Sequence, residues 1–201
     1  MPRRNAMLKY LLAFFFVLFG KTDNLFSFWK AEIIRRDKLV IHRLLREKKQ
    51  RNRNFLFWWR LANEMYINGG KIQKKAAEKL NIRILEKFGC EISLGATIGK
   101  GLMIPHHAGI VIHNAVEIGE NFVIRQNTTI GQKDSDKKTA RLIIGDNVDI
   151  GANTCIVGLT HRIGNNVKIG AMSFVNGDIP DNCTYITRKQ NSVITHHSTM
   201  Q

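Results

Sequence analysis

The sequence predicts a mainly β protein, a parallel β-helix of hexapeptide repeats preceded by an α-helical N-terminal region. Two observations carry this: helical apolar spacing ends at Gly89, and aliphatic residues then recur every six positions. Sixfold spacing fits neither an α-helix nor a simple sheet, but it is typical of a solenoid in which each hexapeptide forms one short face. We therefore expect a basic amphipathic arm over residues 1–50, a helical region over 51–90, the β-helix over 91–187 and a tail over 188–201.

The net charge of +15 belongs to the N-terminal part of the chain. Residues 1–60 hold 15 Lys and Arg against 4 Asp and Glu, whereas residues 91–201 hold 10 against 9. A basic arm of this kind indicates an anionic partner such as a membrane face. No nucleic-acid motif and no base-stacking platform accompany it, so we expect no nucleic-acid partner.

The arm contains an apolar run over residues 10–19, which is shorter than the about 20 residues of a membrane span. Residues 25–49 read as one basic amphipathic helix. Two interpretations stay open: an interfacial anchor in peripheral contact with a membrane, or a helix that packs on its own domain or on a neighbouring subunit. As an anchor, the arm would be separable from a folded, active β-helix.

The three cysteines, Cys90, Cys155 and Cys183, are an odd number without metal-ligand spacing. They favour reduced thiols in a cytosolic protein. With the anchor interpretation of the arm, this predicts a cytoplasmic protein at the inner face of the membrane.

Two helices are expected before the repeats. Residues 54–67 have helical apolar spacing and stop at Asn68-Gly69-Gly70, a sequence that favours a helix end. Residues 71–88 carry apolar residues at fourfold spacing, and Gly89 ends them. The spacing predicts a helical pair.

The sixfold pattern runs in four sets with breaks between them. The sets are Ile92, Ile98, Ile104 and Ile110, then Ile112, Ile118, Ile124 and Ile130, then Ile144, Ile150 and Ile156, then Ile163, Ile169 and Val175. One break lies between Ile110 and Ile112. Another contains the polar segment QKDSDKKTAR at 132–141, which predicts a loop of the kind that often carries function in solenoids.

The repeats and the motifs around them resemble the serine acetyltransferase-like hexapeptide acyltransferases over about residues 54–187. The matching segments are FWWRLA in the helices, PHxxGIVI in the first repeats, and then QNTTIG, IGDNVDIGANT and IGNNVKIGAMSFVNGDIPDN. The resemblance implies a left-handed β-helix, a homotrimer or a dimer of trimers, and acetyl-CoA bound in grooves between subunits.

The resemblance also implies catalytic roles for His106 and Glu91. His106 would take the proton of an acceptor hydroxyl, a step typically worth about 10²–10⁴-fold. Glu91, where the family has aspartate, would orient the imidazole. With eighteen residues per coil, Gly109 would stack on Glu91 near His106, and an N–H near Gly109 would stabilise the oxyanion. His107 should point to the opposite face.

We expect backbone groups in four matching repeat positions to hold acetyl-CoA, namely Gly151, Ala152, Gly170 and Ala171. Arg188 and Lys189 stand where the family has a Gly-Val-Pro-Ala segment, and they would meet the CoA phosphates. No metal is expected, because the histidines lack metal spacing.

Three functions compete at this point. The first is an acetyl-CoA-dependent O-acetyltransferase acting on a sugar hydroxyl of capsule, exopolysaccharide or lipopolysaccharide. The alternative is a serine O-acetyltransferase in cysteine biosynthesis, and the third is a non-catalytic scaffold. The sugar is favoured because the family's aspartate before the catalytic histidine is Pro105 here. Only Arg141 survives of the family's Arg-His pair, at the end of the 132–141 loop, and we expect it to bind substrate.

Overall fold

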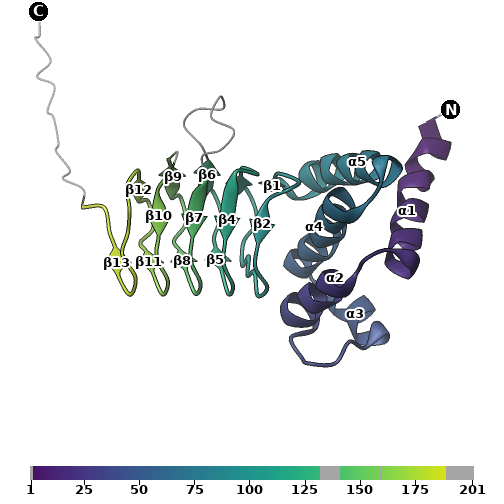
Figure 1. Cartoon of the computed structure of the whole chain (residues 1–201), viewed down its shortest axis with the longest axis horizontal. Helices are drawn as coiled ribbons and strands as arrows, with labels where there is room; N and C mark the ends of the chain where they lie inside the picture. Colours follow the sequence, from purple (N-terminus) through teal and green to yellow (C-terminus); the bar gives the residue numbers. More distant parts are fainter. Residues whose placement is uncertain (1, 132–140, 159, 189–201) are drawn as a thin grey trace, which may run out of the picture.

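The computed structural model describes residues 2–131, 141–158 and 160–188 (Figure 1). Its N-terminal half is helical and its C-terminal half is a stack of short parallel strands. The helical elements are α1 (Pro2–Phe19), α2 (Asp23–Phe28), the π-helical η1 (Trp29–Ile34), α3 (Ile41–Glu47), α4 (Arg51–Asn68) and α5 (Lys71–Phe88).

The expected helical pair is confirmed in α4 and α5. Helix α4 ends at Asn68, before the Gly69-Gly70 pair, and α5 ends at Phe88. Gly89 follows in the left-handed region with φ of 60°, which costs glycine little. Its N–H closes the helix on the Leu85 carbonyl at 2.8 Å. This turn leads the chain from α5 into the first strand.

The expected single helix over residues 25–49 is wrong. The segment divides into α2, η1 and α3, with Arg35 in a left-handed conformation at φ of 55°. The apolar residues of the segment explain the break. Trp29 and Ile33 are buried on one side of the bend and Leu44 on the other, and the bend lets η1 pack on α4 while α3 folds back against η1.

Part of the arm packs on its own domain, as the second of the two open interpretations expects. Trp29 stacks on Phe57 of α4 with 4.4 Å between ring centroids. Glu32 forms a buried ion pair with Arg60 of the same helix. Because of this packing, we expect removal of the arm to destabilise the rest of the chain. Within residues 7–19 of α1, however, most of the large apolar side chains stay exposed.

By length and composition, no individual helix in the described part of the chain qualifies as a membrane span. One bent pair, Met7–Phe19 with Asp23–Ile34 at 95°, passes the same criteria when its two members are taken together.

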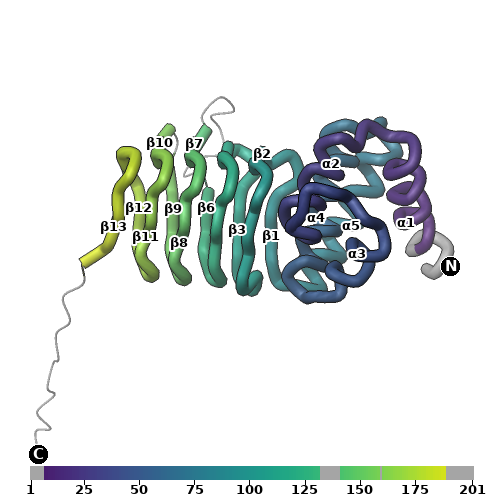
Figure 2. The backbone as a smooth tube through the Cα atoms, turned by 90° about the horizontal axis from the view of Figure 1, so that it is seen from below, coloured from purple at the N-terminus to yellow at the C-terminus, as the bar shows by residue number. Residues whose placement is uncertain are grey.

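The strands form three parallel sheets that the chain visits in turn (Figure 2). The first sheet is β1-β3-β6-β9-β12, the second is β10-β7-β4-β2 and the third is β13-β11-β8-β5. The strands are β1 (Glu91–Ile92), β2 (Thr97–Ile98), β3 (Val111–Ile112), β4 (Val116–Ile118), β5 (Val123–Ile124), β6 (Thr129–Gly131), β7 (Leu142–Ile144), β8 (Asp149–Ile150), β9 (Cys155–Val157), β10 (Arg162–Ile163), β11 (Lys168–Ile169), β12 (Phe174–Val175) and β13 (Thr184–Tyr185).

The repeat isoleucines fill the space between the three sheets. Ile92, Ile112, Ile130 and Ile156 stack in register along the first sheet, and all are buried. Their neighbours on each strand point outward, as alternation along a strand requires. The sixfold pattern therefore reports the core of the stack, as expected.

The expected register of the first coil is wrong. Glu91 pairs with Val111, not with Gly109, and Ile92 pairs with Ile112. The first coil is therefore two residues longer than eighteen. The extra residues lie after Ile104, in the corner that contains His106 and His107. Ile110, which seemed to belong to the first set, is a buried corner residue outside the register.

Candidate active site

His106 and the four expected cofactor positions lie along one edge of the strand stack. His106 follows Met103, which bridges to Val123 of the third sheet, and precedes β3 of the first sheet. Gly151 and Ala152 lie between β8 of the third sheet and β9 of the first. Gly170 and Ala171 lie between β11 and β12, so all five positions share the edge where these two sheets meet.

The paired histidines point in opposite directions, as adjacent residues on extended backbone should. His106 is exposed, whereas His107 is only 6% exposed. The His107 ring packs on Phe88 and Phe55, at centroid distances of 5.3 and 6.3 Å. Its Nδ1 has no partner in the described part of the chain. Burial lowers the pKa of His107, so this imidazole is a neutral packing group.

Glu91 lies on the outer face of β1 with its side chain exposed. Its N–H donates to the Ile110 carbonyl at 2.8 Å, which ties it to the end of the histidine corner. Among the hydrogen bonds and ion pairs of the described residues, none joins Glu91 to His106. The backbone therefore brings the two residues to one end of the stack without joining their side chains.

Gly109 is not a free oxyanion donor. Its N–H donates to the Gly89 carbonyl at 2.7 Å, and its φ is 69°. A side chain there would meet the Asn127 amide oxygen, at 2.3 Å from an added Cβ. Gly109 thus allows the histidine corner to stack closely on the coil below it.

The cofactor positions leave backbone donors available on the shared edge. The N–H groups of Gly151 and Gly170 are bonded to the coil below, whereas those of Ala152 and Ala171 donate to no backbone carbonyl of a described residue. A Cβ on Gly151 would lie 2.4 Å from the Ala171 nitrogen, so only glycine permits this stacking. The edge therefore offers free donors on a narrow, regular surface.

The remaining site residues divide between this edge and another one. Arg188 is exposed at the end of the shared edge, after β13, while Lys189 lies outside the described residues. Arg141 lies between β6 and β7, at the edge of the first and second sheets, where it forms an ion pair with Glu117. Within one chain the first sheet therefore separates Arg141 from His106.

Gln126 is a further candidate for the site that the sequence analysis did not identify. It lies on the shared edge, one coil after His106, and its buried Oε1 has no partner among the described residues. Its neighbour Arg125 pairs with Asp149 of the next coil. Gln126 stands in the QNTTIG segment that carried the family resemblance, and its position in that motif was the available signal.

The described residues contain no group of three or more His, Cys, Asp and Glu side chains that could hold a metal ion. The edge presents an exposed imidazole and backbone donors on the following coils, with the Glu91 carboxylate at the same end of the strand stack. An imidazole can take a proton from a hydroxyl, and backbone N–H groups suit the amide and carbonyl groups of a bound chain.

Comparison with known proteins gives a consistent picture. No family model matches the chain. Over 127 residues it is 42% identical to a serine acetyltransferase of Staphylococcus epidermidis, a match that covers 63% of this chain and 57% of the relative. A serine acetyltransferase of Staphylococcus aureus is 38% identical over 116 residues, which cover 57% and 54%. The chain spans just over half the length of the curated relatives it matches.

Solved structures agree with these relatives. A serine acetyltransferase of Neisseria gonorrhoeae in complex with serine has a TM-score of 0.63 and 32% identity, covering 81% of this chain and 65% of that one. A serine acetyltransferase in complex with CoA has a TM-score of 0.59 and 27% identity, covering 67% and 54%.

These findings correct the expected acceptor. The relatives and the structural neighbours named above are serine acetyltransferases, and one of the structures holds serine, so the interpretation as a surface-polysaccharide acetyltransferase is wrong. Pro105 in place of the family's aspartate does not exclude serine, because a single position does not define an acceptor site. The helical region and the parallel sheets match those of serine acetyltransferases, so this chain is similar to these proteins in both sequence and fold.

Proposed function

We propose that this protein transfers an acetyl group from acetyl-CoA to the hydroxyl of L-serine. The observation that carries the proposal is the shared edge, on which an exposed His106 precedes free backbone donors on successive coils. The similarity to serine acetyltransferases supports the same reaction. We infer that residues 91–187 wind as a left-handed β-helix, as the resemblance implies.

His106 is the general base of the proposed reaction. Its imidazole takes the proton of the serine hydroxyl as the oxygen attacks the thioester carbonyl. When the tetrahedral intermediate collapses, the carbon–sulfur bond breaks and the imidazolium returns the proton to the CoA sulfur. Glu91 lies at the same end of the stack and stabilises the imidazolium through its negative charge. The products are O-acetylserine and CoA.

Acetyl-CoA would lie along the shared edge. The N–H groups of Ala152 and Ala171 donate to its amide and carbonyl oxygens, and Gly151 and Gly170 keep the surface narrow enough for the chain to approach. Gln126, whose Oε1 lacks a partner among the described residues, would accept a hydrogen bond from the same chain. Arg188 and Lys189 would meet the phosphates at the far end.

Serine recognition requires a cation for the carboxylate, and we assign this to Arg141. Its ion pair with Glu117 is exposed, so exchanging Glu117 for a substrate carboxylate is inexpensive. Because Arg141 and His106 occupy different edges of one chain, a complete site needs a second copy. This supports a homotrimer or a dimer of trimers, with the sites between subunits. A cytoplasmic location completes the proposal, in keeping with the three free thiols.

The test is release of CoA thiol from acetyl-CoA with L-serine as acceptor. His106→Asn should lower kcat/KM by at least about 10²-fold. His42→Asn, an exposed histidine on α3 away from both edges, is the control and should keep the wild-type rate. Glu91→Gln should lose less than His106→Asn, and Arg141→Ala should raise KM for serine more than KM for acetyl-CoA. Full activity in His106→Asn would contradict the proposal.

A further inference from the structure

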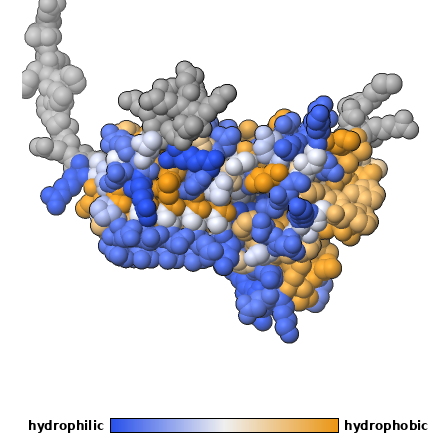
Figure 3. All heavy atoms as spheres, in the orientation of Figure 1, coloured by the Kyte–Doolittle hydropathy of each residue, from blue (hydrophilic) through white to orange (hydrophobic). Residues whose placement is uncertain are grey.

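Helix α1 exposes an apolar face at the end of the molecule farthest from the last strands (Figures 1 and 3). Between residues 7 and 19 only Lys9, Ala13 and Phe16 are buried. The exposed large apolar side chains of α1 are Met7, Leu8, Tyr10, Leu11, Phe14, Phe15, Leu18 and Phe19. A helix that is apolar on nearly all sides is normally covered by protein or by lipid.

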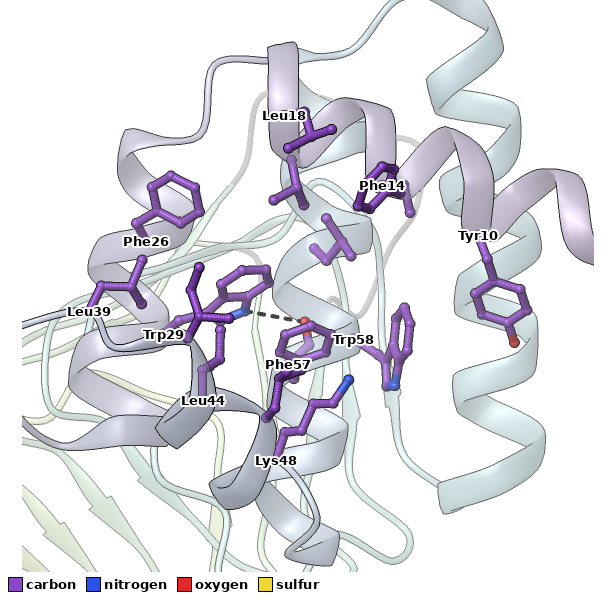
Figure 4. Close-up of a pocket in the computed structure, with 15 residues that line it drawn as sticks. Tyr10, Phe14, Leu18, Phe26, Trp29, Leu39, Leu44, Lys48, Phe57 and Trp58 are labelled. Carbon is purple, nitrogen blue, oxygen red and sulfur yellow. Dashed lines mark hydrogen bonds between the residues drawn. The ribbon is translucent and has the colours of Figure 1, made fainter.

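Beside this face lies an apolar cavity of about 540 Å³, lined by side chains from α1, η1, α3 and α4 (Figure 4). Phe14 and Leu18 approach it from α1, Leu44 from α3, and Trp29 and Phe57 from the packed interior. This volume is typical of small-molecule pockets, which run from about 300 to 1,000 Å³. An unbranched hydrocarbon chain matches a lining so free of polar groups.

Lys48 supplies the one charged side chain in the lining of this cavity. Its Nζ lies 4.6 Å from the ring centroid of Phe57 and 5.5 Å from that of Trp58. Burial lowers the pKa of the Lys48 amine, and a nearby anion would favour its charged form. An apolar cavity with a single cation is suited to a ligand with a hydrocarbon tail and an acidic head.

The charges around the cavity favour a lipid surface over a second copy of the chain. Exposed cations on residues 21–50 are Lys21, Arg35, Arg36, Lys38, Arg46 and Lys49. Of the four acids in this segment, Glu32 pairs with Arg60 and Glu47 with Arg46 and Arg53. A two-fold contact would set this face against itself and bring like charges together. Anionic headgroups would instead neutralise them.

We propose that α1 and α3 dock on an anionic phospholipid bilayer, with a lipid acyl chain entering the cavity and Lys48 pairing with a headgroup phosphate. Docking by this end leaves the strand stack and the His106 edge facing away from the bilayer. The proposal does not depend on the proposed acetyl transfer, because it uses none of the residues of that edge.

The experiment is flotation of the purified full-length chain with vesicles of phosphatidylglycerol and phosphatidylcholine, compared with phosphatidylcholine alone. The double variant Phe14→Asp and Leu18→Asp changes two side chains that are 58% and 55% exposed, so the core stays intact. The matched control is Ile82→Asp on α5, which is 57% exposed and does not line the cavity. Circular dichroism verifies that both fold.

Wild type and Ile82→Asp should float with the anionic vesicles. The double variant should bind at least about tenfold more weakly, because two apolar side chains no longer insert. Lipids with brominated acyl chains should quench the fluorescence of the cavity residues Trp29 and Trp58. If the protein floats but its tryptophan fluorescence is not quenched, it binds only the lipid headgroups. That result would overturn the entry of an acyl chain into the cavity. No flotation by wild type at low salt, with a smaller assembly of the double variant in sedimentation velocity, would assign this face to a second copy instead.

Discussion

The carboxylate of Glu32 in η1 and the guanidinium of Arg60 in α4 form an ion pair at 2.6 Å, with both side chains at most 1% exposed. Arg60 also donates to the carbonyls of Ile98 and Gly99, at 2.8 and 2.7 Å. Glu32 in turn accepts from the N–H of Leu102 at 3.2 Å. One buried pair therefore joins the arm, the helical region and the first coil of the strand stack.

Glu32→Ala should lower the free energy of unfolding by about 3–5 kcal/mol, because it leaves the Arg60 charge buried without its partner. Urea denaturation monitored by tryptophan fluorescence measures the loss. The control is Glu86→Ala, which removes an exposed partner of Arg83 and should cost less than about 0.5 kcal/mol. Equal losses in the two variants would show that the buried Glu32–Arg60 pair contributes no more to stability than the exposed Arg83–Glu86 pair.

Deleting residues 1–50 should destabilise the remaining chain, contrary to the expectation of a separable arm. The deletion removes Glu32 and also uncovers Phe57, which stacks on Trp29. A loss of several kcal/mol should lower Tm by about 10 °C or more in a chain of this size. Thermal unfolding of the truncated and full-length chains is the measurement, and an unchanged Tm would show that the arm is separable after all.

Stability should fall in mild acid because of His107. Its pKa is lowered in the folded state, chiefly by burial and then by Arg51, so the unfolded chain binds the proton more readily. Stability is therefore full above the unfolded pKa of about 6.5 and is lost as the pH falls toward the lower folded value. His107→Phe, between Phe55 and Phe88, should flatten this dependence between about pH 7 and 5. His113→Ala should keep the wild-type dependence of stability on pH. If the wild type and both variants showed the same dependence, His107 would be excluded as its source.

Gly151→Ala should impair both the fold and the use of acetyl-CoA. The added Cβ would lie 2.4 Å from the Ala171 nitrogen, so two coils must separate, at a cost of about 1–3 kcal/mol. The matched control is Gly131→Ala, where an added Cβ meets no described residue within 4 Å. Thermal unfolding and KM for acetyl-CoA measure the two effects. If Gly131→Ala impaired the protein as much as Gly151→Ala, close stacking of the coils would not explain the loss.

The strand stack was predictable because each repeat isoleucine has to be buried, and this requirement recurs at a fixed short spacing. Ile112, Ile130 and Ile156 must all face the core, and a sixfold period leaves few other folds. The helix ends at Asn68 and Phe88 were predictable for a similar reason, since glycines after them signal the stop within a few residues. His106 was found through a motif, and its exposure beside a buried His107 follows from alternation along extended backbone.

Features that depend on pairs distant in sequence could not be read in this way. The first coil could have held its extra residues before or after Ile110, and only the pairing of Glu91 with Val111 decided between them. The arm breaks into three helices, and Glu32 of η1 pairs with Arg60, a partner that no local pattern identifies. By itself, then, the sequence determined the repeating core and the candidate histidine His106, because both rest on short patterns within the repeats. The tertiary structure decided the register at the histidine corner, the division of Arg141 and His106 between two edges, and the apolar cavity of the arm, because each depends on contacts between separate segments of the chain.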